Sequence, residues 1–279
     1  LDAVGELAHL VDRDGARLPD ALADNGVTPT GMARAHDHFQ SLDARAYLEL
    51  HIEQGPVLES MNKACAVVLG TMGVERHTLR FVGQTAHSGA APMHLRKDAF
   101  LAAAELAIAC RAIAVSHSGR SPRSRVVATC GVVKVEPNFV TAVPGSSEIS
   151  LDLRALDGKV LKSMLAEAKR AAQAAAKKHR VTVAWSPLLH ITPRPFDETL
   201  MGFVGAAIKS VTGKVAPQIP SGPLHDASEM AGVVPTAMLF AQSSPGISHT
   251  RLEDTPLPAL DQAIRAFLLA VDRTLEHLA

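Results

Sequence analysis

Four short segments place polar side chains beside glycine or proline, directly after apolar runs that are typical of strands. Positions of this kind lie at strand ends, where open α/β sheets bind their ligands. The segments are "HIEQGP" (51–56), "GQTAHSGAAPMHLRKDA" (83–99), "PSGPLHDASEMA" (220–231) and "SSPGISHTRLEDT" (243–255). We therefore expect the residues that carry chemistry to come mainly from these four segments.

Two histidines in these segments have the placement expected of metal ligands. His51 and His249 each follow an apolar run that is predicted to enter the same domain. Imidazole nitrogens bind zinc, and strand ends hold such side chains rigidly. The alternative is a hydrogen-bonded loop histidine, which is the more common role of a lone histidine at a strand end.

Each of the other candidates has two interpretations. His87 is either a turn histidine or a donor that reaches across to a substrate carbonyl. His225 and Asp226 either form a carboxylate–histidine pair that orients a ligand, or cap the helix that follows them. Arg154 either lies on a solvated sheet face or binds a carboxylate through two parallel hydrogen bonds.

Composition narrows the class of protein. The 279 residues suffice for two domains, and 28 basic residues balance 28 acidic ones, so no basic excess points to nucleic acid. The longest apolar stretch, "AFLAAAELAIAC", is short and contains Glu105, so we expect no membrane span, and no signal peptide is visible. Three widely spaced cysteines without a CxxC motif indicate reduced thiols and a cytoplasmic protein.

Residues 74–186 carry strand and helix patterns in the order β-α-β-β-α-β, which is the ferredoxin-like order. We expect strands in "RHTLRFVG", "RVVATCGVVKVEP", "SEISLDLRAL" and "VTVAW", and helices in "RKDAFLAAAELAIACRAIA" and "DGKVLKSMLAEAKRAAQAAAKKHR". Glycines precede this stretch, and "SPLLHITPRP" after it is predicted to be a linker. Residues 74–186 are therefore predicted to form an inserted domain.

The flanking stretches, 1–73 and 187–279, are predicted to be two parts of one α/β domain that the insertion splits. Strands are expected in "AYLELHI", "ACAVVLG" and "VVPTAMLFAQ", and two helices around a "DRDGA" turn are expected before residue 40. Another helix should follow the N-cap residue Asp197. The last helix should bury an apolar stripe made of Leu260, Ile264, Phe267, Val271, Leu275 and Leu278.

The candidate segments, together with "EPNFVTAVPGSSEISLDLR" and in this order, resemble the N-carbamoyl-L-amino-acid hydrolase group. Its relatives are allantoate amidohydrolase and β-ureidopropionase, within the di-metal aminoacylase–carboxypeptidase superfamily. The resemblance implies a split zinc-hydrolase catalytic domain with an inserted ferredoxin-like domain that serves as a lid and forms a homodimer. It also implies an amidohydrolase that cleaves a linear ureido or amide C–N bond in a small carboxylate-bearing substrate.

The resemblance assigns roles to individual residues. His51 and His249 match two metal ligands, and His87 matches a lid-domain histidine that contacts substrate, often in the neighbouring subunit. Arg154 matches the arginine that binds the substrate carboxylate. The remaining substrate contacts are predicted to be Gln54, Thr141, Ser221, Gly222 and His225. The complete enzyme is expected to hold two divalent ions of zinc, manganese, cobalt or nickel.

The sequence departs from the family in three respects. The family's His-x-Asp block and Glu-Glu pair, which supply the other ligands and the base, do not occur in these 279 residues. We therefore expect a catalytic domain that is incomplete at its N-terminal side and that alone binds one ion weakly or none, with Glu53 and Asp226 as poor substitutes. Thr141 and Leu224 stand where the family usually has asparagine and glycine, which leaves the exact substrate open.

Two other functions are compatible with this sequence. One is an aminoacylase or dipeptidase of the same superfamily. The other is a non-catalytic fragment in which the inserted domain mediates dimerisation. The "HIEQGP" and "GISH" segments favour the carbamoylase type over the aminoacylase or dipeptidase. The metal content of the protein would distinguish an enzyme from a non-catalytic fragment.

Overall fold

The computed structural model describes residues 7–119 and 121–279, which belong to two compact units, residues 1–46 and 47–279. The first unit contains the short helices α2 (Leu18–Asp24), α3 (Pro29–Ala33) and α4 (Ala35–Ser41). The predicted "DRDGA" turn is present, since the Asp12 carboxylate accepts hydrogen bonds from the N–H groups of Asp14 and Ala16. The start of the helix predicted before this turn lies outside the described residues. Leu10 and Val11, at its expected end, are exposed and are not helical.

The first sheet of the second unit contains the three strands predicted for the split domain and two short additional strands. They are β1 (Tyr47–Ile52), β2 (Cys65–Thr71), β10 (Arg194–Pro195), β11 (Gln218–Ser221) and β12 (Thr236–Ala241). The order is β1-β12-β2-β10, with β11 also paired to β2. β1 runs parallel to β12, and β12 runs antiparallel to β2. All residues of β2 and β12 are buried, as expected for strands covered on both faces.

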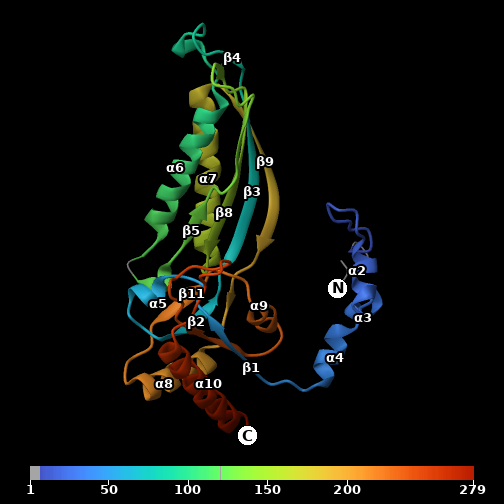
Figure 1. The fold of residues 1–279 in the computed structure, drawn as a ribbon, viewed down its shortest axis with the longest axis vertical. Coiled ribbons are helices and arrows are strands. Elements are labelled where there is room, and N and C mark those ends of the chain that lie inside the picture. The colour runs from blue at the N-terminus through green and yellow to red at the C-terminus, as the bar shows by residue number, and fades with distance from the viewer. Residues whose placement is uncertain (1–6, 120) are drawn as a thin grey trace. The chain divides into compact units, whose positions relative to one another are not determined.

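Two long helices, α8 (Glu198–Thr212) and α10 (Leu257–Leu278), pack against each other and against this sheet (Figure 1). α8 begins at the predicted cap, where the Asp197 carboxylate accepts a hydrogen bond from the Leu200 N–H at 2.9 Å. The short helices α5 (Val57–Ser60) and α9 (Asp226–Met230) follow β1 and β11 respectively. The first sheet is therefore built from both sides of the chain that flank residues 74–186.

The buried face of α10 differs from the prediction. Its buried residues are Ala259, Ala263, Ala266, Ala270 and Thr274, whereas Ile264 and Leu275 of the predicted leucine-rich stripe are exposed. Small side chains allow a helix to approach its neighbours closely, so tertiary packing selects the alanine face. The predicted apolar face is therefore wrong by about one helical position.

The second sheet has the predicted ferredoxin-like arrangement. It contains β3 (Gly73–Val82), β5 (Val127–Thr129), β6 (Val133–Glu136), β8 (Ser146–Ala155) and β9 (Thr182–Ile191). All pairs are antiparallel, in the order β5-β8-β3-β9 with β6 also on β8. The helices α6 (Ala99–His117) and α7 (Gly158–His179) cover one face, as Figure 1 shows, and enclose a core with Leu79, Phe81, Leu106, Leu151 and Met164.

Two local predictions within this sheet are wrong. The stretch "RVVATCGVVKVEP" forms two short strands rather than one, because the chain leaves the sheet after Thr129 and rejoins β8 at Val133. Residues 186–191 of the predicted linker belong to β9. This strand continues beside the N-terminal half of β3 until Ile191 pairs with Val74. The strand therefore crosses the domain boundary predicted at residue 186.

Helix α6 alone among the described helices is long and apolar enough to suit a membrane span by length and composition. The sequence prediction, which relied on a short apolar stretch, does not anticipate this. Its buried residues pack into the core of the second sheet and are Ala99, Ala102, Ala103, Leu106, Cys110, Ile113 and Ala114. The apolar composition of α6 is therefore partly explained by this packing.

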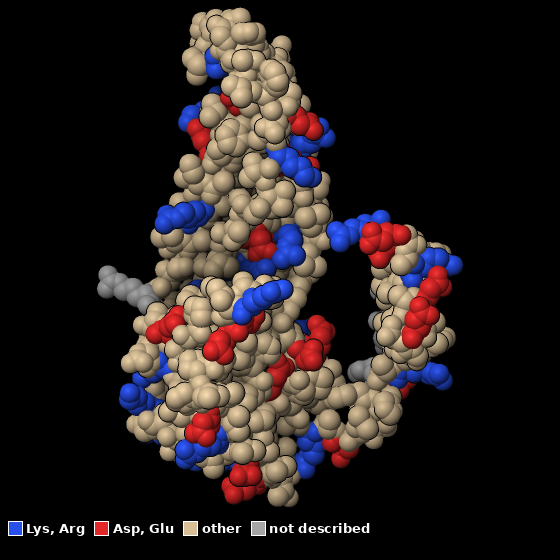
Figure 2. Space-filling view, in the orientation of Figure 1, with Lys and Arg blue, Asp and Glu red and all other residues tan. Residues whose placement is uncertain are grey.

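Shorter elements complete the second unit. They are β4 (Ala86–His87), β7 (Ala142–Val143), and the 3₁₀ helices η1 (Met93–Leu95) and η2 (Pro122–Ser124). β4 and β7 pair with each other, and Figure 1 places β4 at the end of the second sheet that is distant from β11 and β2. Acidic and basic side chains are interspersed on the visible face of the second unit (Figure 2), in keeping with the zero net charge.

Candidate active site

His51 lies near the end of β1, as predicted, and is paired in register with Phe240 of β12. Its Nδ1 atom lies 2.7 Å from the carbonyl oxygen of Ile52. Glu49 precedes it by two residues on the same strand, so both side chains leave the same face of the sheet. The strand thus presents a carboxylate and an imidazole side by side.

His225 joins this pair from the turn between β11 and α9. The His51 and His225 ring centroids are 4.5 Å apart, and His225 Nδ1 lies 3.6 Å from Glu49 Oε1. In the described part of the chain, Glu49, His51 and His225 form the one group of three metal-type ligands whose atoms lie within 4.8 Å of one another. These three side chains are arranged so that they could hold a metal ion.

The surroundings of His225 bear on both of its predicted roles. Burial lowers the pKa of His225 to about 4, with a further contribution from nearby His51. The ring is therefore neutral at physiological pH, which is the state that binds metals. Its carboxylate neighbour is Glu49 rather than the predicted Asp226, although His225 also occupies the N-cap position of α9.

The loop that carries His249 approaches the end of β1 through Glu253. This carboxylate accepts hydrogen bonds from the backbone N–H of His249 at 2.9 Å and from the side chain of Gln54 at 3.2 Å. His249 itself is exposed, has a φ of 59°, and is not in the three-residue group. Its role as a metal ligand stays a prediction.

A cleft of about 700 Å³ lies beside the three-residue group. Gln54, Arg154 and Gly222 from the predicted site line it, and so does Phe240, whose ring is 5.6 Å from that of His225. Phe240 therefore connects the cleft with the histidine pair. The volume suits a small molecule.

Arg154 is held within this cleft by protein groups. Its guanidinium donates two hydrogen bonds to Asp152, at 2.7 and 3.2 Å, and one to the Gly222 carbonyl at 2.9 Å. Asp152 also accepts two hydrogen bonds from Arg76. Burial raises the pKa of Asp152, but the bonds from Arg154 and Arg76 outweigh it, so that this pKa is lowered overall.

The sequence predictions omitted several cleft and site residues. Arg125 also lines the cleft, where it donates to the Pro220 carbonyl at 3.0 Å, and burial lowers its pKa. A signal was available for Glu49, which is two residues from His51 in "LELHI", and for Arg76 and Asp152, which strand pairing places opposite each other. No local pattern marked Arg125, because it lies in a loop.

The surroundings of Glu53 and Leu224 bear on two of the sequence predictions. Glu53, considered as a substitute ligand, accepts hydrogen bonds from the N–H groups of Val57 and Leu58 at 2.8 Å each, so its carboxylate caps the start of α5. Burial raises its pKa. Leu224, predicted to add bulk near the ligand, is 51% exposed and does not line the cleft.

His87 and Thr141 lie together but away from the cleft. Both are at the β4–β7 pair, where the Ser88 N–H donates to the Thr141 carbonyl at 2.9 Å. This pair is at the distal end of the second sheet (Figure 1). Ser221 lies elsewhere, fully buried with its hydroxyl 2.7 Å from His225 Nε2. The predicted site residues thus form two separate groups in one chain.

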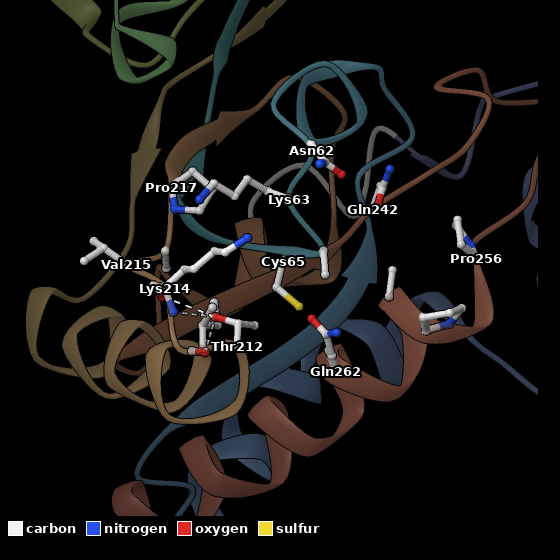
Figure 3. A pocket seen from close by; sticks show the side chains of 15 residues that line it. Asn62, Lys63, Cys65, Thr212, Lys214, Val215, Pro217, Gln242, Pro256 and Gln262 are labelled. Atoms are coloured by element: carbon white, nitrogen blue, oxygen red, sulfur yellow. Dashed lines mark hydrogen bonds between the residues drawn. The ribbon is translucent and has the colours of Figure 1, made fainter.

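A second pocket, of about 300 Å³, lies near the start of β2 (Figure 3). It is lined by Cys65 and by the polar side chains of Asn62, Lys63, Thr212, Lys214, Gln242 and Gln262, among others. None of the predicted site residues lines it. The candidate active site is therefore the 700 Å³ cleft with its adjoining histidine pair.

Comparison with known proteins agrees with the resemblance. The model of peptidase family M20/M25/M40 matches residues 20–273. N-carbamoyl-L-amino acid amidohydrolase of Geobacillus stearothermophilus is 31% identical over 87% of this chain and 57% of its own length. Allantoate amidohydrolase of Escherichia coli K12 is 30% identical over 95% of this chain and 62% of its own length.

Solved structures give the same result for the fold. An amidase of the hydantoinase/carbamoylase family from Burkholderia multivorans has a TM-score of 0.76 at 32% identity, covering 81% of this chain and 54% of that chain. A similar amidase from Burkholderia phymatum has a TM-score of 0.82 at 26% identity, covering 99% of this chain and 65% of that chain. The chain thus spans less than two thirds of the length of these relatives.

Proposed function

Because this chain belongs to peptidase family M20/M25/M40, we propose that the whole protein is a metal-dependent amidohydrolase. Its substrate is a small carboxylate-bearing molecule with a linear ureido or amide C–N bond. The observation that carries the proposal is a metal-competent group, Glu49, His51 and His225, beside a cleft that contains Arg154. The names of the relatives, carbamoyl-amino-acid and allantoate amidohydrolases, support the ureido class.

Arg154 is proposed to bind the substrate carboxylate. A guanidinium has five N–H donors, and three of those of Arg154 are used by Asp152 and Gly222. Two remain for a ligand in the cleft, which suits a carboxylate that accepts two parallel bonds. Asp152 holds the guanidinium in one orientation, so its donors are already positioned when the substrate arrives.

The metal-binding residues fit one divalent ion, because two neutral imidazoles and a carboxylate are a donor set found in catalytic zinc sites. When bound, such an ion polarises a carbonyl and lowers the pKa of a water molecule. Phe240, whose ring lies 5.6 Å from that of His225, lines the cleft together with Gln54, so the group lies next to the bound substrate. A second ion, with His249 as a ligand, belongs to the same proposal.

His87 and Thr141 are proposed to act in the site of a neighbouring subunit of a homodimer. Their position at the β4–β7 pair, remote from the cleft of their own chain, supports this. His87 then donates a hydrogen bond to the substrate carbonyl oxygen as charge develops there. A cytoplasmic location also stays a prediction of the sequence.

The test is a comparison of substrates with the metal-loaded whole protein. We expect hydrolysis of N-carbamoyl amino acids or allantoate, and slower or no hydrolysis of N-acetyl amino acids and dipeptides. Arg154→Ala should raise KM for these substrates by about 100-fold or more, since it removes a charge-assisted fork of about 3 kcal/mol. Val127→Ala, at another lining position, is the control and should leave KM near the wild-type value.

Faster hydrolysis of dipeptides or N-acetyl amino acids would instead establish the peptidase or aminoacylase alternative. Loss of all activity in a folded, metal-loaded protein would favour the dimerisation-module alternative. An unchanged KM in Arg154→Ala would remove its assigned role.

A further inference from the structure

We infer that Arg125 binds a second carboxylate of the substrate, so that the cleft favours N-carbamoyl derivatives of acidic amino acids. The inference deepens the proposed function and rests on it for the ureido group and for the first carboxylate, which Arg154 binds. It is carried by the position of Arg125 in the cleft, the donors that its guanidinium leaves unused, and its distance from Arg154.

The backbone brings Arg125 to the cleft from a constrained position. Its N–H donates to the Pro122 carbonyl at 3.3 Å, so the residue directly follows the 3₁₀ helix η2. The next residue, Val126, is buried in the core of the second sheet. Between these two anchors, the side chain of Arg125 lines the same cleft as Arg154.

Most donors of the Arg125 guanidinium are not used by the described protein groups. One of its five N–H groups donates from Nη2 to the Pro220 carbonyl at 3.0 Å, and its buried Nε has no partner in the part of the chain that the structure describes. Arg154, by comparison, uses three donors on Asp152 and Gly222. Arg125 therefore keeps donors on its terminal nitrogens for a ligand.

The positive charge of Arg125 also lacks a paired carboxylate. Arg76 and Arg154 each form an ion pair with Asp152, whereas Arg125 forms none with a described residue. Glu53 attracts this charge from a greater distance, but its oxygens accept hydrogen bonds from two backbone N–H groups of α5. A half-buried cation without a paired carboxylate is stabilised when a ligand supplies one.

Gly222 lies near both arginines and limits their spacing. Its carbonyl accepts the hydrogen bond from Arg154 Nη1 at 2.9 Å, and a Cβ atom at this residue would lie 3.9 Å from Arg125 Nη2. The two nitrogens are therefore within about 10 Å of each other. Two carboxylates three or four covalent bonds apart, as in aspartate and glutamate, can span this separation with hydrogen bonds of about 2.9 Å at each end.

A purely structural role is the competing explanation, because the hydrogen bond from Arg125 to Pro220 links η2 to β11. Such a link needs one donor and no positive charge. A second alternative is that Arg125 and Arg154 hold the same carboxylate. Both alternatives predict that Arg125 does not distinguish a ligand with two carboxylates from a ligand with one.

The experiment compares N-carbamoyl-L-glutamate with N-carbamoyl-L-glutamine, which differ only in whether the side chain ends in a carboxylate or an amide. Binding to the whole protein, stripped of metal so that neither ligand is hydrolysed, is measured by calorimetry. We expect N-carbamoyl-L-glutamate to bind at least about 10-fold more tightly at low salt, and added salt to reduce this preference.

Variants assign the preference to Arg125. Arg125→Gln should bring the two affinities within about 3-fold of each other without changing that for N-carbamoyl-L-glutamine, and Arg125→Lys, which keeps the charge, should retain part of the preference. Arg154→Ala should weaken both ligands, since both carry the first carboxylate. Arg123→Gln is the matched control, because Arg123 lies two residues away in η2 and does not line the cleft. It should leave both affinities unchanged.

Equal binding of the two ligands to the wild type, or an equal loss for both in Arg125→Gln, would overturn the inference. Absence of binding by either ligand would do the same. Hydrolysis by the metal-loaded whole protein tests the proposed function separately. The expected binding preference without hydrolysis of either compound would contradict that function alone, whereas hydrolysis without any preference would contradict the role of Arg125 alone.

Discussion

At the scale of residues, the hydrogen-bond partners decide what each candidate can do. Glu53 and Glu49 lie on the same short segment, yet Glu53 is used to cap α5, whereas Glu49 keeps one oxygen free beside His225. The orientation of Arg154 likewise depends on Asp152, whose carboxylate accepts two hydrogen bonds from the guanidinium and holds it in the cleft. Residue type therefore specifies the available chemistry, and the neighbours select the part that is used.

His77 shows how such an environment produces a dependence on pH. Burial lowers its pKa below the ordinary value, although a hydrogen bond from its ring to Glu75 at 3.0 Å acts in the opposite direction. The unfolded chain therefore takes up this proton first as the pH falls. As far as His77 is concerned, the folded state keeps its full stability above the unfolded-state pKa of about 6.5. It loses stability as the pH falls from there through the pKa of His77 in the folded protein.

We predict that the free energy of unfolding decreases as the pH is lowered below about 6.5, and that His77→Leu reduces this decrease. The sole tryptophan, Trp185, lies 5.2 Å from the His77 ring, so its fluorescence can follow urea unfolding at each pH. His9→Leu, in the other unit, is the control and should keep the wild-type slope. An equal slope in His77→Leu and the wild type would contradict the prediction.

At the scale of elements, α10 shows that packing can override a strong apolar pattern. Its alanine face is buried and its leucine-rich face is partly exposed, because only small side chains fit at the close contacts. Strand β8 of the second sheet, by contrast, follows its alternation and buries every second residue. A period of two separates the faces of a strand completely, whereas neighbouring stripes on a helix overlap.

We predict that Ala266→Leu destabilises the second unit by about 1–3 kcal/mol, because the added atoms have no space at a fully buried position. Leu275→Ala, on the exposed face of the same helix, should change stability by less than about 0.5 kcal/mol. Urea denaturation midpoints provide the measurement. A larger loss in Leu275→Ala than in Ala266→Leu would restore the leucine-rich face as the buried one.

At the scale of the whole molecule, the proposed homodimer and the separation of His87 from Arg154 together predict complementation between subunits. A dimer formed from one His87→Ala chain and one Arg154→Ala chain has one site that contains both native side chains. At a substrate concentration well below the raised KM of Arg154→Ala, a mixture of the two impaired variants should therefore regain up to about a quarter of wild-type activity, since half of the dimers are mixed and each has one intact site.

The control for complementation combines Arg154→Ala with Gln54→Ala, whose altered residues line the same cleft of one chain. In mixed dimers of this pair each site keeps one defect, so no activity should return. No recovery in the first mixture, with mixed dimers shown to be present, would contradict the assignment of His87 to the neighbouring site.

Most of the fold was predictable because its patterns are local. Alternation in "SEISLDLRAL", the buried runs of β2 and β12, and the cap at Asp197 all reflect interactions within a few residues. The predictions failed where a distant element decides the outcome, as in the division of β5 from β6 on β8 and the extension of β9 along β3.

The sequence by itself determined the family, the order of the main strands and helices, and His51 as a candidate ligand. Only the tertiary structure brought Glu49, His51 and His225 within 4.8 Å, and placed His87 and Thr141 at a different end from Arg154. The reason is physical: residue types and periodicities are properties of short segments, whereas a site requires distances between segments about 175 residues apart, and these depend on sheet pairing.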